Sequence, residues 1–444
     1  MLKTTVPTYY KARRQALAGK RPGAAFIFAA NPEYHRNNDV EYPFRQDSSF
    51  YYLCGFDEPE SFLVVLPSLS APGASKSVLF VRERDIEKEM WVGERYGIDG
   101  ALKVFGVDEV YPVTEFRTKM MELLKSCDSI YYRIGHHEPT DRVIFSLLES
   151  FRASQGRTGK SLLSINDPVT LVGEMRLYKS PEEVQDLRQA CRISALAHKT
   201  AMEQVRPGMN ESEVAALVDY VLRKGGCQRE GYGSIVGGGR NATCLHYRAN
   251  NEILRDGDLL LIDAGGEFNY FTGDITRTFP IGKTFTASQA KIYDLTLKSQ
   301  LEGIQLAKPG THYHDIHKHV CKVLTEGLLS LGVLKGNAND ILKTLEYKRF
   351  FPHGTGHWLG MDVHDTGLYY DEHGESRTIE PGMVFTVEPG IYFQPTDPGF
   401  PAEFKHIGIR IEDDILITAN GNEVLTSGAP KAREEIEALR RAAF

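Results

Sequence analysis

Two stretches in the C-terminal half decide the fold: LLLIDAG at residues 259–265 followed by FTGDI at 271–275, and VFTVEPG at 384–390 followed by IRIE at 409–412. Acidic residues end or interrupt runs of Leu, Ile, Val and Phe in all four segments. An ionised carboxylate in such a run is costly unless a counter-charge or a metal ion compensates it. Four such carboxylates, with His357 between the two pairs, therefore predict a metal site. The carboxylates are Asp263, Asp274, Glu388 and Glu412.

Residues 258–264 and 270–279 are expected to form a β-hairpin. A turn centred between Phe268 and Asn269 would place Asp263 opposite Asp274. Cross-strand neighbours on one face are close enough to share a metal ion. For this segment taken alone, an exposed acidic pair on an edge hairpin is the alternative.

The two acidic stretches belong to an internal repeat. Residues 256–265 align with residues 381–390, because each has a Gly, an apolar run, the acid and then a Gly-containing turn. Upstream, Pro207-Gly208 and Pro309-Gly310 each precede an apolar pattern with helical spacing. A duplicated helix–strand unit predicts two similar halves about an approximate two-fold axis, each contributing two carboxylates.

Length and composition limit the class of protein. The 444 residues are 25% charged and 41% hydrophobic, which is typical of a soluble globular protein with two domains. The net charge of −7 gives no support for binding to nucleic acid. No stretch approaches the roughly 20 apolar residues of a membrane span, and the N-terminus lacks a signal-peptide core. The six scattered cysteines are expected to be free thiols, so we expect a cytoplasmic protein without a membrane partner.

The domain boundary is expected between about residues 150 and 180. Residues 154–161 are polar and contain Gly, as linkers do, and residues 180–183 (SPEE) start a helix with a capping box. Before the boundary, strand-like runs alternate with helical or loop segments, which predicts an α/β domain over residues 1–173. After it, two helices precede an antiparallel sheet in each half, which predicts an α+β domain over residues 174–444.

Two further segments resemble binding motifs. Residues 237–240 (GGGR) look like a phosphate cradle but lack the following Lys and Ser or Thr, so a turn that approaches another backbone is expected. Residues 312–319 hold four histidines and resemble a metal-binding tract. This tract aligns in the repeat with residues 210–214 at a helix start, so a solvated helix face is expected instead.

With these residues in view, the chain resembles the metallopeptidases of the pita-bread fold, which include methionine aminopeptidase, prolidase and Xaa-Pro aminopeptidase (aminopeptidase P). That family binds two divalent ions through two Asp, one His and two Glu in this order. The matching residues and motifs are Asp263 in IDAGG, Asp274 in TGDITRTF, His357 in HGTGHWLG, Glu388 in TVEPGIY and Glu412 in GIRIEDD. The resemblance implies two divalent ions, with Mn²⁺ first and Zn²⁺, Co²⁺ or Fe²⁺ as alternatives, since carboxylates and one imidazole suit all of them.

The N-terminal domain narrows the resemblance. Residues 42–53 (YPFRQDSSFYYL) and Gly55-Phe56 are similar to the N-terminal domain of aminopeptidase P. Methionine aminopeptidases lack that domain, creatinase has it without the ligands, and prolidase has a related one. The resemblance implies attack by a metal-bridging hydroxide on the bond between an N-terminal residue and a following proline. A prolidase acting on Xaa-Pro dipeptides is the nearest alternative, and a non-catalytic binding protein on this fold is the more distant one.

The resemblance also implies roles beside the ions. Glu388 would be both a metal ligand and the proton shuttle from the bridging water to the leaving amine. His246 and His364 match the histidines that contact the tetrahedral intermediate, and His353 matches a further active-site histidine. Of the three acids at residues 412–414, the family pattern selects Glu412 as the ligand.

Three more residues have a functional and a structural interpretation. Arg410 lies two residues before Glu412 on the same strand face, so it either orients the acids or is a surface charge. Tyr392 either lies beside the metals or belongs to the core. Trp91 either belongs to the core or packs on the proline ring, from a domain that in related enzymes reaches a neighbouring subunit's site. The resemblance thus implies peptide substrates with proline second, and a homodimer or homotetramer.

Overall fold

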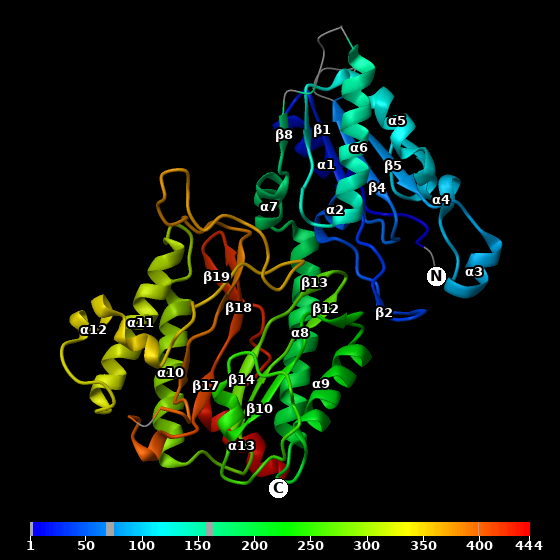
Figure 1. Ribbon diagram of the computed structural model, residues 1–444. Helices are drawn as coiled ribbons and strands as arrows, with labels where there is room; N and C mark the ends of the chain where they lie inside the picture. The colour runs from blue at the N-terminus through cyan, green and yellow to red at the C-terminus, as the bar shows by residue number, and fades with distance from the viewer. Residues whose placement is uncertain (1–2, 68–74, 157–161, 163, 398) are drawn as a thin grey trace. The chain divides into compact units, whose positions relative to one another are not determined.

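The computed structural model describes residues 3–67, 75–156, 162, 164–397 and 399–444. The chain divides into two compact units, Met1–Met175 and Arg176–Phe444 (Figure 1). Among the described residues, none of the helices combines the length and the apolar character that crossing a membrane requires.

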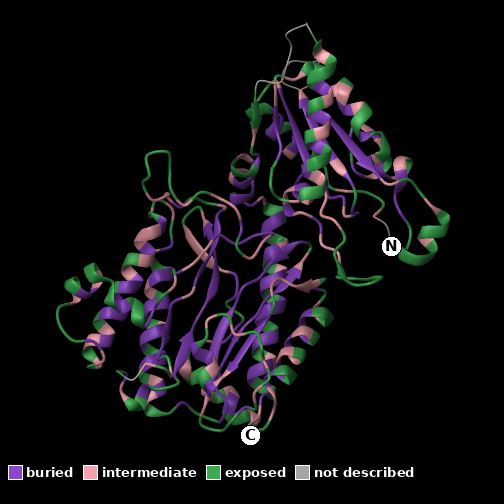
Figure 2. Ribbon diagram, viewed as in Figure 1, coloured by how far each residue is buried: buried purple, intermediate pink, exposed green. Residues whose placement is uncertain are grey.

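The first unit is an α/β domain, as expected. Six strands form one mixed sheet in the order β6-β5-β4-β1-β7-β8. Strands β1, β4 and β5 correspond to the predicted runs and are almost continuously buried, as strands in a sheet covered on both faces are (Figure 2). The strands are β1 (Ala24–Ala29), β2 (His35–Asn37), β3 (Val40–Glu41), β4 (Phe62–Pro67), β5 (Ser75–Val81), β6 (Glu109–Pro112), β7 (Ser129–Tyr131) and β8 (Ser164–Asn166). The helices are α1 (Tyr9–Lys20), α2 (Ser48–Cys54), α3 (Ile86–Val92), α4 (Gly97–Val104), α5 (Phe116–Leu123), α6 (Glu138–Gln155) and α7 (Val169–Leu177), which contains the boundary.

The second unit is the expected α+β domain. In each half two long helices precede a three-stranded antiparallel sheet, β10-β11-β14 in the first and β15-β18-β19 in the second. The first half also contains the three-stranded sheet β13-β12-β9. Its helices are α8 (Pro181–Gln204), α9 (Glu211–Gly225), α10 (Ala287–Leu306), α11 (Tyr313–Ser330), α12 (Ala338–Thr344) and α13 (Arg433–Ala443). Its strands are β9 (Arg229–Glu230), β10 (Ile235–Gly238), β11 (Leu259–Asp263), β12 (Gly266–Phe268), β13 (Phe271–Thr272), β14 (Thr276–Pro280), β15 (Val384–Val387), β16 (Gly390–Tyr392), β17 (Gly408–Arg410), β18 (Asp413–Thr418) and β19 (Gly421–Val424).

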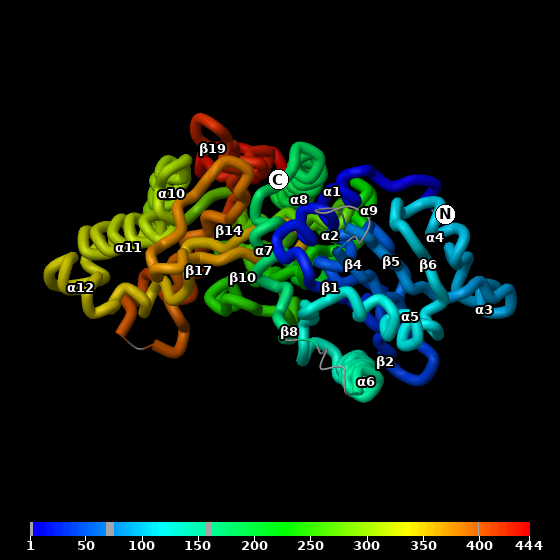
Figure 3. The backbone as a smooth tube through the Cα atoms, turned by 90° about the horizontal axis from the view of Figure 1, so that it is seen from above, coloured from blue at the N-terminus to red at the C-terminus, as the bar shows by residue number. Residues whose placement is uncertain are grey.

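The start of α8 and the internal repeat are confirmed. Ser180 caps α8 in a complete capping box with Glu183. In the first half the amide of Gly208 donates to the carbonyl of Leu254 at 2.8 Å, and in the second half Gly310 donates to Ile379 at 3.0 Å. Each half then packs its two helices together, α8 with α9 and α10 with α11, and the second pair lies side by side in Figure 1 and Figure 3. The duplicated pattern in the sequence therefore corresponds to a duplicated structure.

The hairpin of the first half has a register different from the predicted one. Asp263 lies opposite Thr276, and extending the pairing of β12 with β13 places Asp274 opposite Gly265. The prediction that Asp263 faces Asp274 is therefore wrong. The turn is formed by Asn269 and Tyr270, which both have positive φ, as the two central residues of a type I′ hairpin turn do. The turn therefore lies one residue later than expected. A shift of the pairing by two residues keeps both acids on one face.

Gly265 permits the close approach of the two strands beside the acids. A Cβ at this position would lie 1.7 Å from the carbonyl oxygen of Gly273, so only glycine fits. In the second half, β15 pairs with β18 and β16 with β17 in one continuous register. That register places Glu388 opposite Glu412, the arrangement that had been predicted for the first half.

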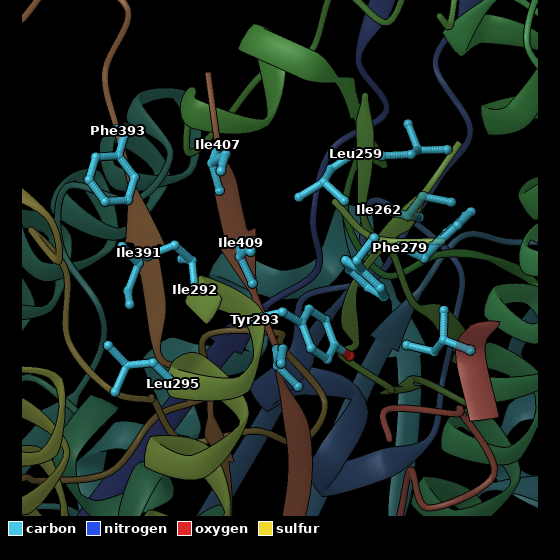
Figure 4. Close-up of a cluster of buried hydrophobic side chains, with 14 of the residues drawn as sticks. Leu259, Ile262, Phe279, Ile292, Tyr293, Leu295, Ile391, Phe393, Ile407 and Ile409 are labelled. Atoms are coloured by element: carbon cyan, nitrogen blue, oxygen red, sulfur yellow. The ribbon is translucent and has the colours of Figure 1, made fainter. Parts of the chain in front are cut away.

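One hydrophobic core supports both hairpins. Figure 4 shows side chains of β11, β14, β16, β17 and α10 meeting in it. Ile262 and Ile409 point into this core. Because successive residues of a strand face opposite sides, the neighbouring Asp263 and Arg410 point away from it. Core packing thus directs the polar residues to one common hollow.

The two motif-like segments have structural roles. A Cβ at Gly237 would lie 2.9 Å from the carbonyl carbon of Asn241, which confirms the close backbone approach. The histidine tract does begin a helix, α11, with His312 before its first turn. A solvated face is the wrong description for its other histidines, because later loops and α10 pack against them. These contacts are His314 Nδ1 to Ser376 Oγ at 3.0 Å, His317 Nδ1 to Thr355 Oγ1 at 2.8 Å and His319 Nε2 to Glu302 Oε2 at 2.7 Å.

Candidate metal centre

A cavity of about 480 Å³ in the second unit contains all five predicted metal ligands. The three predicted histidines and Arg410 also line it. The remaining lining residues are Tyr232, Ile235, Leu245, Arg248, Gly354, Gly356 and Val363. The structure thus brings residues from four separate stretches of the sequence to one hollow.

The ligand atoms converge within this cavity. One oxygen or nitrogen each of Asp274, His357 and Glu412 lies within 4.8 Å of the others. His357 Nε2 is 3.4 Å from Asp274 Oδ2 and 3.8 Å from Glu388 Oε1. The hydroxyl of Tyr232 joins the remaining acid to the group, because it lies 2.6 Å from Asp263 Oδ1 and 2.5 Å from Asp274 Oδ1.

Hydrogen bonds between the two halves fix the acids. Thr276 Oγ1 donates to Glu412 Oε2 at 2.6 Å, and the amide of Glu412 donates to the carbonyl of Thr276 at 3.1 Å. The amide of Asp274 donates to Asp414 Oδ2 at 2.9 Å. Each hairpin therefore holds the other's ligands in place.

The turn that carries His357 lies directly on β15. A Cβ at Gly356 would lie 1.9 Å from the carbonyl oxygen of Thr386, so the HGTGH motif needs glycine there. The amide of His357 donates to Thr386 Oγ1 at 3.1 Å, and the amide of Glu388 donates to the carbonyl of Thr355 at 2.8 Å. These bonds hold the imidazole beside the strand that ends in Glu388.

Arg410 is buried among the acids, so its interpretation as a surface charge is wrong. Its side chain is 5% exposed, and its Nη2 lies 2.6 Å from Asp263 Oδ2. Its Nη1 donates to the hydroxyl of Tyr392 at 3.0 Å, and that hydroxyl is 2.9 Å from His353 Nε2. Tyr392 is fully buried, yet its hydroxyl belongs to a polar chain that runs from His353 to Asp263.

The histidines lie around the ligand group. The rings of His364 and His357 are 4.3 Å apart between centroids and meet edge to face. His353 Nδ1 is 3.6 Å from Glu388 Oε2, and burial is the main cause that lowers the pKa of His353 to about 3. His246 is exposed and lines the same cavity. Imidazole side chains in these places can form hydrogen bonds with a bound peptide.

Comparisons with known proteins agree with this geometry. A sequence model described as metallopeptidase family M24 matches residues 185–419, more than half of the chain, and one described as the N-terminal domain of aminopeptidase P matches residues 10–131. This chain belongs to metallopeptidase family M24. The Xaa-Pro aminopeptidase of Escherichia coli is 43% identical over 98% of both chains, and that of Haemophilus influenzae is 39% identical over 99% of this chain and 98% of its own. The structure of Pseudomonas aeruginosa aminopeptidase PepP superposes with a TM-score of 0.94 at 42% identity, covering 99% of each chain.

The donor set of this M24 peptidase fits a divalent metal. Burial raises the pKa of Asp263 and Glu412, and that of Glu388 to about 7. The neighbouring acids add to these rises, and the positive charge of Arg410 opposes them. Burial alone would lower the pKa of His357, but the hydrogen bond with Asp274 and the charge of Glu388 raise it to about 9. The four carboxyl groups of the cavity outnumber the two cationic side chains beside them, Arg410 and His357. Buried oxygen donors with one imidazole are the ligands that first-row divalent ions take.

The structure also separates the acids of the IEDD motif. Glu412 lines the cavity. Asp413 points the other way, into a buried ion pair with Arg277 at 2.6 Å and with Lys431 at 2.6 Å. Asp414 accepts from Cys191 Sγ at 3.2 Å. Only the first acid of the motif is thus available to a metal in this cavity.

Trp91 lies on the surface of the first unit. It is 89% exposed on α3 of the first unit, so the interpretation as a core residue is wrong. Its neighbours Ile86, Met90 and Val92 are also exposed. A role for Trp91 toward substrate stays a prediction.

Proposed function

We propose that this M24 peptidase is an Xaa-Pro aminopeptidase that releases an N-terminal residue when proline follows it. The observation that carries this proposal is the resemblance to Xaa-Pro aminopeptidases along the whole chain, including the N-terminal domain, together with an intact set of five donors in one cavity. A prolidase is less well supported, since the curated relatives named above are Xaa-Pro aminopeptidases. A non-catalytic binding protein is less well supported because the donor set is complete.

We propose two divalent ions, preferably Mn²⁺, with Asp263, Asp274, His357, Glu388 and Glu412 as their ligands. A solved relative described as zinc-substituted E. coli aminopeptidase P supports a divalent metal in this cavity. When bound, two such ions supply an activated water and polarise the scissile carbonyl.

The side chains around the ions supply the rest of the chemistry. Glu388 takes up a proton and passes it to the leaving amine, as a carboxylate beside the reacting groups can. His364 and His246 donate hydrogen bonds to the oxygen on which negative charge develops. Arg410 holds the Asp263 carboxylate in place, and Tyr392 holds the guanidinium of Arg410.

Selection of proline follows from the shape of its peptide bond. A bond to proline has no N–H and carries a rigid ring on the leaving side. Ile235, Leu245 and Val363 add apolar walls to the cavity and suit such a ring.

A second copy of the chain could add Trp91, because α3 exposes four neighbouring apolar side chains of the kind that associate. We therefore propose a homo-oligomer, dimer or tetramer, in the cytoplasm.

One assay separates the alternatives. Mn²⁺-loaded protein is given Xaa-Pro dipeptides, Xaa-Pro-Xaa tripeptides, longer Xaa-Pro peptides and Met-Ala-Ser peptides. We expect cleavage of the tripeptides and longer peptides, with slow or no hydrolysis of the dipeptides. Cleavage of dipeptides alone would make the protein a prolidase, and preference for Met-Ala-Ser would exclude both functions.

A further inference from the structure

A buried ion-pair cluster lies beside the loop that carries His364. Arg176 Nη2 is 2.7 Å from Asp362 Oδ2 and bonds Asp365 Oδ1, and Lys179 Nζ is 3.4 Å from Asp365 Oδ2. The side chains of Arg176, Lys179 and Asp365 are at most 3% exposed. None of them lines the cavity. The chemistry proposed above uses none of these groups.

The cluster closes the loop at residues 358–365. The amide of Asp365 donates to the carbonyl of Trp358 at 2.8 Å, and Trp358 is fully buried. The carbonyl of Gly360 accepts from the amide of Thr272 at 2.9 Å, two residues before Asp274. A Cβ at Gly360 would lie 2.1 Å from Asp365 Oδ2, so the loop packs directly on the carboxylate. His364 precedes Asp365 in this closed loop.

Stability alone is a poor reason for such a cluster. A buried ion pair loses much of its attraction to desolvation, and well-packed apolar residues often replace it without loss. A buried pair is better suited to fixing one arrangement of the chain. Here the ion pairs fix Asp365, the residue next to His364. The ring centroids of His364 and His357 are 4.3 Å apart.

We propose that Asp365, held by Arg176 and Lys179, is a positioning residue that keeps His364 in its productive place beside the metal centre. This inference rests on the catalytic role proposed for His364. A displacement of about 1 Å by a change outside the reacting groups can cost about 10²-fold in rate. The cluster should therefore act on turnover through His364 and leave metal binding unchanged.

The first test compares Asp365→Asn with the milder Arg176→Lys, which keeps the positive charge. The matched control is Arg440→Lys, because Arg440 is also buried in this unit but donates to main-chain carbonyls, those of Met202, Val205, Ile281 and Gly282. We expect Asp365→Asn to lower kcat at least about tenfold with KM within about twofold and metal content unchanged. Arg176→Lys should lower kcat by less, and Arg440→Lys should lower only the melting temperature. Wild-type kcat in both cluster variants would overturn the inference.

The second test is a double-mutant cycle of Asp365→Asn with His364→Ala. If the role of Asp365 were purely structural, the two substitutions would lower kcat independently. In the His364→Ala background, Asp365→Asn should lower kcat by less than about twofold, because the residue that it positions is gone. Hydrogen exchange in residues 358–365 should rise in Asp365→Asn and stay unchanged in Arg440→Lys. If Asp365→Asn lowers kcat by the same factor in the His364→Ala background as in the wild type, the inference is overturned, while the proposed role of His364 stands. Wild-type kcat in His364→Ala would instead reject the proposed role of His364, and the inference with it.

Discussion

Glu388 lies opposite Glu412 where the two strand pairs of the second hairpin meet. In the first hairpin Asp263 lies opposite Thr276, two residues beyond Asp274, so the two acids do not face each other. The hydroxyl of Tyr232 contacts both acids and links them. The two halves thus deliver their carboxylates to one cavity by different registers. Without a cation, burial and mutual repulsion oppose the ionisation of this group, as the raised pKa of Glu412 indicates.

Metal removal should abolish activity and destabilise the protein. Exhaustive chelation should remove all peptidase activity, and Mn²⁺ should restore it. An ion present at 100 times its Kd stabilises the folded state by about 2.7 kcal/mol, so the melting temperature should rise on reloading. The measurements are peptide hydrolysis and thermal unfolding of the same samples. Full activity after complete chelation would contradict a metal-dependent mechanism.

Asp274→Asn should lose metal and activity together without destabilising the metal-free protein. The substitution removes a ligand. In the absence of metal, the relief of repulsion among the buried acids offsets the lost attraction to His357. Bound metal is measured by elemental analysis, and the melting temperature is measured in chelator. The matched control is Asp219→Asn, which changes an acid in an exposed ion pair with Arg223 and should retain metal and activity. Normal metal content in Asp274→Asn would remove this residue from the ligand set.

His364→Ala should keep its metal and its fold but lose most of its turnover. A donor to a developing oxyanion is worth roughly 10²–10³ in kcat. The measurement is kcat at saturating metal, with metal content determined in parallel. His312→Ala is the control, because His312 is exposed and lies outside the cavity.

The acids and motif glycines were predictable because their signal is local. Asp263 and Glu388 each end an apolar run, and a carboxylate there needs an explanation whatever the tertiary structure. The register of the first hairpin was not predictable in the same way. Its turn is Asn269-Tyr270, and a Tyr with positive φ is not the Gly that usually marks such a turn.

Contacts between distant segments account for the rest. Tyr232 lies 31 and 42 residues from the two acids that its hydroxyl contacts, and no pattern around it indicates a role. The histidine tract pairs with residues as distant as Ser376, so its burial depends on loops that follow it by some sixty residues. Neither spacing nor composition carries information about such partners.

The buried His198 should make stability depend on pH below neutrality. Its Nε2 lies 2.9 Å from the carbonyl oxygen of Ala264, beside Asp263, and burial lowers its pKa to about 4. An unfolded histidine has a pKa of about 6.5, so between pH 6.5 and 4 the unfolded chain binds a proton that the folded protein does not. Stability is therefore lost as the pH falls through this window, by about 2 kcal/mol at pH 5.

His198→Gln isolates this effect, because its amide can still donate to Ala264 but does not titrate. The free energy of unfolding is measured in urea at pH 7 and at pH 5, on metal-free protein since metal binding also changes with pH. Between pH 7 and pH 5, the free energy of unfolding should fall by about 2 kcal/mol less in the variant than in the wild type, even if the variant is less stable at both pH values. His312→Gln, the same substitution at an exposed position, is the control. An equal loss in wild type and His198→Gln would show that His198 is protonated inside the folded protein, which its complete burial argues against.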